Sequence, residues 1–281
     1  MSPATISTHV SIPAGDASGP NGTYNLGATV DAPAGMTAET LQEGRVPTAI
    51  VVACFTCARS AVGVTRISKT LAKHGLVSLR IDLAGLGTSG GAFEKTTLSS
   101  NVADVLAAAA WLETHAQGPS LLVGHSLGGC AVIRAAAQVD SVRAVATIGT
   151  PFDPRHVWDS IPQVAAELGA AVEDNRDDCT VPISDRGVSV GTEFFRDLRS
   201  VDPEADMQAL KQRGIQHLGI HAPDDDVVDY AEALSFVSSP ARISSLLTMP
   251  DIDHLLQRRG SGQRVGELIA TWSDHRRTLF L

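Results

Sequence analysis

The stretch SLLVGHSLGG, from Ser120 to Gly129, decides the fold of this 281-residue chain. Its first half is apolar, and the residues after it, CAVIRAAAQV, have the composition of a buried helix. The pattern predicts a strand, a sharp turn at Ser126 and a helix. Such a turn strains the backbone at the serine, so the residues two positions away, Gly124 and Gly128, must lack bulk.

The turn gives Ser126 the position of a nucleophile. Its hydroxyl would project at the helix N-terminus, where partial positive charge favours a developing oxyanion. The alternative is a glycine-rich helix start without chemistry, since a bare G-x-S-x-G pattern also arises by chance. Between a strand and a helix, however, the pattern is typical of the nucleophile elbow of α/β hydrolases. The sequence therefore predicts an α/β-hydrolase fold with Ser126 as the nucleophile.

The rest of the sequence alternates short β-branched runs with longer runs rich in Ala and Leu. The short runs predict strands over Thr8–Ile12, Leu26–Asp31, Thr48–Cys54, Val77–Asp82, Ser120–Gly124, Ala144–Ile148, Ile215–His221 and Arg242–Thr248. The longer runs predict helices over Val62–Lys73, Asn101–His115, Leu127–Val139, Tyr230–Ser238 and Gly262–His275. Central runs such as AIVVACF and AVATIG are apolar on both faces, as parallel strands covered by helices are. We expect a doubly wound, mostly parallel sheet of about eight strands, whose first two strands form an antiparallel edge.

One long segment, Pro151–Gly214, departs from this alternation. It contains an expected helix over His156–Leu168, an acidic run over Glu173–Asp178, a hairpin-like VPISDRGVSV with a turn at Asp185–Gly187, and a helix near Glu193–Leu198. The segment is too long for a simple connection and too patterned for disorder. We expect it to form a lid over the active site, within a single domain that spans residues 1–281.

Composition limits the partners of this chain. Its 22 basic and 31 acidic residues give a net charge of −9, which disfavours nucleic acid and anionic membrane surfaces. The first residues, MSPATISTHVSIPAGD, lack the basic and apolar regions of a signal peptide, and no apolar run is long enough to span a membrane. Four cysteines do not make a disulfide framework. We expect a cytoplasmic protein with free thiols that acts without a cofactor or metal.

A nucleophilic serine needs a histidine base and an orienting carboxylate, which follow in the order Ser, acid, His in this fold. His254 lies after the last predicted strand and follows the acids, so it is the expected base. The acid is harder to choose, because Asp224, Asp225 and Asp226 are consecutive after one strand and Asp153 follows the strand before it. Strand order and spacing leave all four open.

The oxyanion hole requires two backbone N–H donors, one from the residue after the serine and one from the loop after the third strand. These positions are Leu127 and Phe55. Phe55 lies inside the C-x-x-C sequence Cys54-Phe55-Thr56-Cys57, which also occurs at thioredoxin-like redox sites. The chain is far larger than that fold, so we expect a structural role, with Cys54 packed under the oxyanion loop and Cys57 beginning the next helix. The Gly-rich run after Asp82 lacks a phosphate-binding pattern and is expected to be a tight structural turn.

Several longer pieces of the sequence resemble a known family. CFTC, ISKTLAKHGLVSLRIDLAGLGTSGG, SSNVADVLAAAAWL, GHSLGG, ATIGTPFDP and DIDHLL are similar to the α/β-hydrolase domain that is fused to an OsmC-like domain in bifunctional bacterial proteins. The resemblance covers most of residues 26–275. It implies Ser126 as nucleophile and His254 as base, and it implies Asp225 as acid, because the family's HxPxD pattern aligns with the five residues that end at Asp225.

The resemblance also supports Phe55 and Leu127 as the oxyanion donors. The chain departs from the family at Ala53, where a histidine is usual, so support from that imidazole is missing. The OsmC-like half does not follow Leu281, and its peroxide chemistry is not expected here. The family implies a hydrolase and leaves the substrate undefined.

Two classes of function fit these observations. The first is an acyl hydrolase of a small-molecule substrate, because a serine at position 126 favours acyl transfer, whereas epoxide hydrolases and dehalogenases of this fold need an aspartate there. Among acyl substrates we expect an ester before a thioester or amide. The second is a protein that binds a ligand or partner without turnover. Trp158, Phe194 and Phe195 in the expected lid either form its small core or line a modest apolar acyl pocket.

Overall fold

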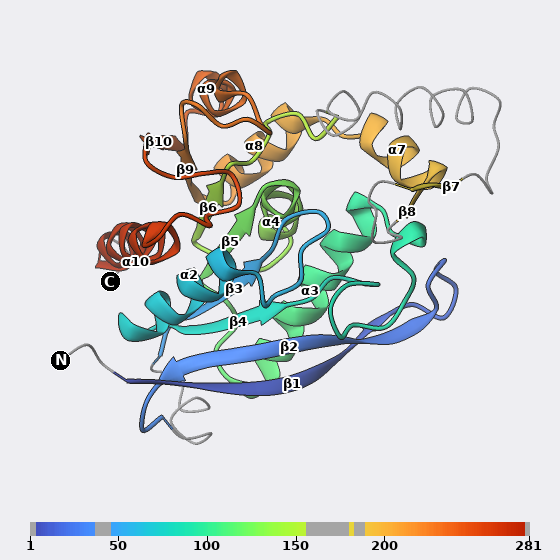
Figure 1. The fold of residues 1–281 in the computed structure, drawn as a ribbon, viewed down its shortest axis with the longest axis horizontal. Helices are drawn as coiled ribbons and strands as arrows, with labels where there is room; N and C mark the ends of the chain where they lie inside the picture. The colour runs from blue at the N-terminus through green and yellow to red at the C-terminus, as the bar shows by residue number, and fades with distance from the viewer. Residues whose placement is uncertain (1–3, 37–45, 156–179, 183–188, 279–281) are drawn as a thin grey trace.

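A sheet of eight strands forms the centre of the molecule (Figure 1). The structure is a computed structural model that describes residues 4–36, 46–155, 180–182 and 189–278. The strands are β1 (Thr5–Gly15), β2 (Thr23–Pro33), β3 (Thr48–Val52), β4 (Val77–Ile81), β5 (Leu121–His125), β6 (Ala144–Ile148), β9 (Gln216–His221) and β10 (Ser244–Thr248). Their order in the sheet is β1-β2-β4-β3-β5-β6-β9-β10.

The strands pair as the sequence predicts. The six strands from β4 to β10 in this order run parallel, while β1 and β2 form an antiparallel edge. This edge pair is longer than expected, with 11 residues in each strand. The reason is that β1 is mostly exposed and buries Ile12 alone along its length, so its apolar pattern does not mark its ends.

Helices cover both faces of the sheet, as expected of a doubly wound fold. They are α2 (Val62–Lys73), α3 (Leu98–His115), α4 (Leu127–Ala136), α7 (Thr192–Arg199), α8 (Pro203–Gln212), α9 (Tyr230–Ser238) and α10 (Ser261–Thr278), with a short 3₁₀ turn η1 (Phe93–Lys95). Figure 1 shows α2 and α10 side by side, and α3 beside α4. The described part of the chain contains no helix that is both long and apolar enough to cross a membrane.

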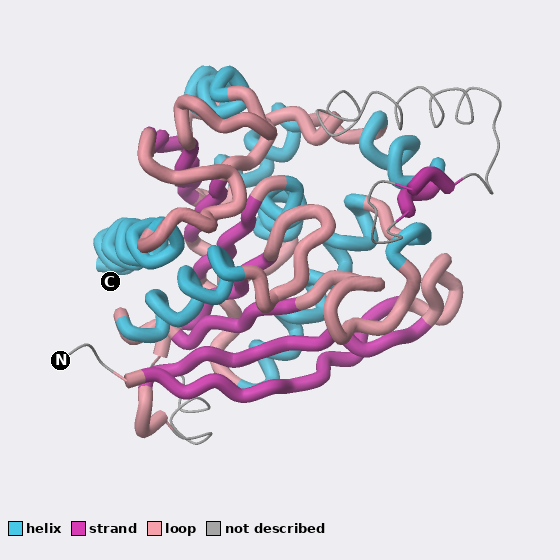
Figure 2. Tube along the Cα trace, in the orientation of Figure 1, coloured by secondary structure: helices cyan, strands magenta, loops and turns pink. Residues whose placement is uncertain are grey.

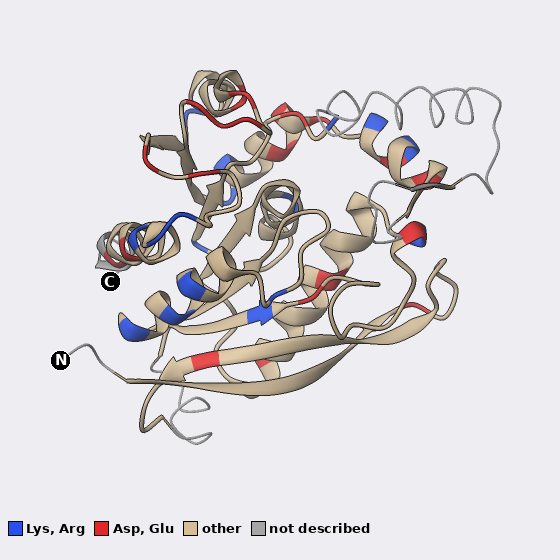
Figure 3. Ribbon diagram, viewed as in Figure 1, with Lys and Arg blue, Asp and Glu red and all other residues tan. Residues whose placement is uncertain are grey.

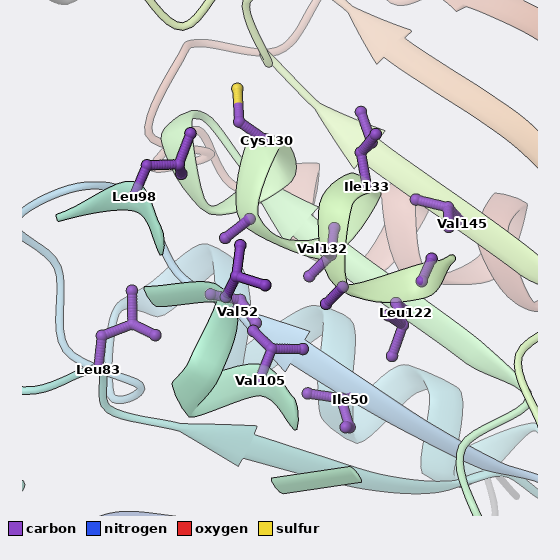
Figure 4. Packing of buried hydrophobic residues seen from close by; sticks show 14 of the residues in the cluster. Ile50, Val52, Leu83, Leu98, Val105, Leu122, Cys130, Val132, Ile133 and Val145 are labelled. Atoms are coloured by element: carbon purple, nitrogen blue, oxygen red, sulfur yellow. The ribbon is translucent and has the colours of Figure 1, made fainter. Parts of the chain in front are cut away.

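Alternate residues of the central strands enter two separate cores. In β3, Ile50 and Val52 pack with residues of α3 and α4 (Figure 4), whereas Ala49 and Val51 pack with residues of α2 and α10. This alternation follows from the two-residue period of a strand. Burial on both faces explains why these strands read as continuous apolar runs, and it makes the sheet a rigid base for the loops at its edge.

The expected lid segment is described in part. Its predicted hairpin is present as β7 (Thr180–Pro182) and β8 (Ser189–Gly191), which pair antiparallel, and the helix predicted near Glu193–Leu198 is α7. Helix α8 was not expected from the sequence, although Asp202 caps it and Pro203 begins it. The predicted helix over 156–168, the acidic run over 173–178 and the turn at 185–187 lie outside the described residues.

Candidate active site

The turn between β5 and α4 has the strained geometry that the sequence predicts. Ser126 has φ of 53°, a positive value that is rare for a residue with a side chain. A Cβ on Gly124 would lie 2.5 Å from the carbonyl oxygen of Gly128. One on Gly128 would lie 2.2 Å from the carbonyl oxygen of Ala53. Both glycines are therefore required by close backbone contacts, and Ser126 is held at the carboxyl end of the sheet.

Two loops bring His254 and Asp225 to this serine. The loops that follow β5, β9 and β10 leave the parallel strands at the same edge of the sheet, where Figure 2 draws them in pink. His254 Nε2 lies 3.2 Å from Ser126 Oγ, and His254 Nδ1 lies 2.9 Å from Asp225 Oδ2. Gly149 leaves room under this pair, since a Cβ there would lie 3.1 Å from His254 Nδ1. The three side chains thus form a continuous hydrogen-bonded series.

Asp225 is equipped to remain ionised. Burial alone would raise its pKa, but hydrogen bonds from His254 and from the backbone N–H groups of Val228 and Val227 hold the pKa of this carboxyl below its usual value. Its Oδ1 accepts both backbone bonds, which leaves Oδ2 for His254. The carboxylate therefore fixes the orientation of the imidazole.

The other three candidate acids do not contact His254 in this way. Asp224 and Asp226 are exposed, on a loop whose acidic residues are red in Figure 3. The Asp153 carboxylate pairs with the guanidinium of Arg155, and its backbone N–H donates to Glu232. Of the four aspartates, the structure brings Asp225 to the histidine.

The two expected oxyanion donors lie next to Ser126. Leu127 is the first residue of α4, so its N–H has no acceptor within the helix. Phe55 lies in the turn that follows β3, and the close approach of Gly128 to Ala53 places this turn directly against the elbow. Both N–H groups therefore belong to backbone that packs around Ser126.

A buried ionic network supports the Phe55 loop, and sequence reasoning did not identify it. The Asp82 carboxylate accepts a hydrogen bond from the Arg59 backbone N–H at 2.5 Å and pairs with the Arg59 guanidinium. Arg80, buried within β4, donates to the Arg59 carbonyl oxygen at 2.7 Å and pairs with Asp31 of β2. The signal in the sequence was a pair of charged residues in and after an otherwise apolar strand. The Gly-rich run after Asp82 is a tight turn, as expected, because a Cβ on Gly87 would meet this carboxylate.

The expectation of free thiols was wrong for the C-x-x-C sequence. Cys54 and Cys57 form a disulfide that closes the turn around Phe55. Cys54 is buried beneath the loop, as expected, but Cys57 does not begin a helix, because α2 starts at Val62. Composition could not reveal the pairing, which depends on the turn that brings the two sulfurs together.

The aromatic residues of the expected lid lie partly within the described structure. Phe194 and Phe195 are each 1% exposed and belong to the main core. The Phe194 ring lies 4.8 Å from that of Phe55, which in turn lies 5.2 Å from Phe93. Trp158 lies outside the described residues. Helix α7 is thus connected by ring contacts to the loop that carries the expected oxyanion donor Phe55.

Known proteins share this architecture. The chain is 25% identical over 224 residues to the mitochondrial palmitoyl-protein thioesterase ABHD10 of Mus musculus, a match that covers 78% of this chain and 69% of that protein. The esterase domain of a Rhodothermus marinus protein is 27% identical with a TM-score of 0.68, covering 97% of this chain and 98% of that one. Est1E of Butyrivibrio proteoclasticus, solved with ferulic acid bound, is 22% identical with a TM-score of 0.74, covering 91% of this chain and 96% of that one.

A family profile extends over most of the chain. The profile described as serine aminopeptidase, S33 (Hydrolase_4), matches residues 45–257, which include the elbow and the loops of Asp225 and His254. The match begins just before β3 and ends just after the histidine loop. This chain therefore belongs to the serine aminopeptidase S33 family of α/β hydrolases.

Proposed function

We propose that this protein hydrolyses carboxylic esters through an acyl-enzyme on Ser126, with His254 as general base and Asp225 as its orienting acid. The observation that carries the proposal is the position of His254, whose two ring nitrogens lie 3.2 Å from Ser126 Oγ and 2.9 Å from Asp225 Oδ2. An ionised carboxylate only accepts hydrogen bonds, so His254 carries its proton on Nδ1 and directs the Nε2 lone pair at the serine.

The reaction follows from this arrangement. Ser126 Oγ attacks the ester carbonyl carbon while its proton passes to His254 Nε2. The carbonyl oxygen becomes an oxyanion that the N–H groups of Phe55 and Leu127 stabilise. The bond to the leaving oxygen breaks as His254 returns the proton to it, and the alcohol departs. Water then attacks the acyl-serine with the same help from His254, which releases the carboxylic acid and regenerates the hydroxyl.

A thioester is the second candidate substrate. It is favoured by the similarity to a palmitoyl-protein thioesterase, at 25% identity over 224 residues. The same steps apply, with a thiolate as leaving group in place of an alkoxide. Matched acetyl and hexanoyl esters and thioesters, compared by kcat/KM on one enzyme preparation, decide between the two classes.

The acyl group is expected to be short to medium in length. Residues 151–214 serve as a lid in this proposal, supported by the contact of Phe194 in α7 with the ring of Phe55. The rings of Phe55, Phe93 and Phe194 pack against one another at the oxyanion loop, so a long acyl chain bound beside this loop would have to displace packed rings. Each methylene that fits contributes up to about 1 kcal/mol, so selectivity rises by several-fold per carbon until the pocket is full.

The experiment measures kcat/KM for p-nitrophenyl esters from acetate to palmitate with wild type, Ser126→Ala, Trp158→Ala and Phe194→Ala. We expect Ser126→Ala to fold normally and to lose about six orders of magnitude in turnover. Phe194→Ala should move the optimum toward longer chains. Retention of more than a few per cent of the wild-type rate by Ser126→Ala contradicts the nucleophile. A wild-type optimum at palmitate contradicts the small pocket, and an unchanged profile in Trp158→Ala assigns that residue to the lid core.

A further inference from the structure

His125, the residue between Gly124 and the nucleophile, contacts the loop of the catalytic base. It is the last residue of β5, and its side chain is 4% exposed. Its Nε2 lies 2.7 Å from the backbone carbonyl oxygen of His254. A carbonyl oxygen only accepts hydrogen bonds, so Nε2 carries the proton and His125 is the donor. The bond connects the strand that ends at the nucleophile with the residue that activates it.

The other contacts of the base loop lie on either side of His254. At its start, the Met249 N–H donates to the carbonyl oxygen of His221 at 2.8 Å. Beyond the histidine, Leu256 is fully buried and packs against Gly63 of α2. Among the described residues, the bond from His125 is the one that reaches the His254 backbone itself. These flanking contacts fix the course of the loop, Asp225 orients the imidazole ring, and the bond from His125 holds the backbone at His254 itself.

The charge state of His125 suits this position. Burial, and then the charge of neighbouring His254, lower the pKa of His125 to about 4, against the opposing influence of the His254 carbonyl, Asp225 and Asp253. His125 is therefore neutral at neutral pH. Its ring lies 5.1 Å from the His254 ring, so a permanent cation here would oppose the imidazolium that forms during catalysis.

We propose that His125 is a positioning residue, whose Nε2–H holds the His254 backbone and thereby sets the distance between His254 Nε2 and Ser126 Oγ. This inference rests on the proposed function, since it assigns His125 a part in the same reaction. A displacement of about 1 Å at a reacting group can lower turnover by about 100-fold. The loss should appear in kcat, because the His125 side chain is buried and donates to the protein backbone.

His217 offers a matched control, because it is a buried histidine of the same sheet remote from the triad. It is 0% exposed on β9, and it shares hydrogen bonds with Thr147 Oγ1 at 2.8 Å and Ser244 Oγ at 2.9 Å. Replacing it perturbs the core without touching His254. A role of His125 in stability alone would make the two positions behave alike.

The test compares His125→Leu, His125→Asn, His125→Gln and His217→Leu with wild type by kcat, KM and thermal midpoint. Glutamine can place an amide N–H near the Nε2 position, whereas asparagine is too short and leucine has no donor. We expect His125→Leu and His125→Asn to lose about 10- to 100-fold in kcat with KM nearly unchanged. His125→Gln should recover most of the rate. His217→Leu should lower the thermal midpoint and keep kcat within about two-fold.

A second measurement does not depend on turnover. In the Ser126→Ala background, the proton between His254 Nδ1 and Asp225 should give a low-field NMR signal that His125→Leu broadens or shifts and His217→Leu leaves in place. An inactive wild type whose signal responds in this way contradicts the proposed function and keeps the positioning role. An active wild type whose kcat is unchanged in the Leu and Asn variants overturns the role of His125. Equal losses of kcat at positions 125 and 217 overturn it as well, and if the leucine variant fails to fold, the Asn and Gln variants decide.

Discussion

Replacing Asp225 by asparagine tests the proposed site most directly. Both oxygens of this carboxylate accept hydrogen bonds from N–H groups: Oδ1 from Val227 and Val228 at 2.9 Å each, and Oδ2 from His254 Nδ1 at 2.9 Å. Asparagine has the same shape but offers one acceptor oxygen and one NH₂ group. One side of Asp225 therefore has to lose its acceptor in the variant.

The two backbone bonds determine which side it is. If the amide oxygen keeps Val227 and Val228, its NH₂ group faces His254 Nδ1, which must then accept. The imidazole proton moves to Nε2, and the ring can no longer take the proton of Ser126. The loss of turnover for such a change is about 10⁴-fold, or about 5.4 kcal/mol in the barrier at 1.36 kcal/mol per decade. Substrate binding is not involved, so KM should change little.

The assay compares four single Asp→Asn variants at positions 153, 224, 225 and 226, using one chromogenic ester and circular dichroism to confirm folding. Asp224 and Asp226 are exposed and Asp153 pairs with Arg155, so these three should keep turnover within a few-fold of wild type. A larger loss at Asp153 or Asp224 than at Asp225 refutes the choice of acid. A loss at Asp225 below about 10-fold refutes the tautomer argument itself.

Three further predictions concern the scaffold. Gly128→Ala places a Cβ 2.2 Å from the carbonyl oxygen of Ala53, just after β3, so it should lower the stability by about 1–3 kcal/mol and kcat by about 100-fold. The control Gly219→Ala, whose Cβ would have its nearest contact at 3.5 Å, should change kcat little. Equal kcat values in the two variants would contradict the need for glycine at position 128. Asp104 is a buried residue of α3, and burial raises the pKa of its carboxyl to about 6 from 3.8. The folded state therefore binds this proton more tightly than the unfolded state does. The contribution of Asp104 to the free energy of unfolding should fall by about 3 kcal/mol as pH rises from about 4 through 6. Urea unfolding should show Asp104→Asn gaining on wild type over that range, and a constant difference between them would refute the assignment. Wild type should not reduce insulin disulfides at a catalytic rate, because Cys54 is buried. Reduction of the Cys54–Cys57 disulfide by excess dithiothreitol should lower the esterase rate, because it loosens the turn that carries the proposed oxyanion donor Phe55. Rapid reduction of insulin by wild type would instead indicate a redox role for the two cysteines.

The parts of the fold that could be predicted are those in which local pattern and burial agree. The strand AIVVA and the strand before the elbow are apolar on both faces, and both proved to be central parallel strands. The sequence predicted the position of the edge strand β1 but not its two ends, because most of its side chains are exposed. Helix α8 was missed although Asp202 and Pro203 mark its start, because it lies within a segment that was interpreted as a lid.

The candidate site shows the same division. The order of elements was enough to single out Ser126 and His254, because each stands alone at its position in the chain. It was not enough for Asp225, since three consecutive aspartates share one loop, and the side chain that faces His254 is decided by the turn that Val227 and Val228 close on Oδ1. The disulfide between Cys54 and Cys57 likewise depends on the turn after β3.

Buried polar residues within or at the ends of the central strands hydrogen-bond to the backbone of neighbouring loops. Arg80 of β4 donates to the backbone of the Phe55 loop, and His125 at the end of β5 donates to the backbone of the His254 loop. His221, at the end of β9, lies 2.9 Å from the carbonyl oxygen of Val228 in the Asp225 loop. A buried polar group must find a partner, and at a strand end the available partners are the backbone atoms of a neighbouring loop. Each such residue therefore holds a loop of the candidate site against the rigid sheet. A polar residue near the end of an otherwise apolar strand is the sequence signal for such a contact.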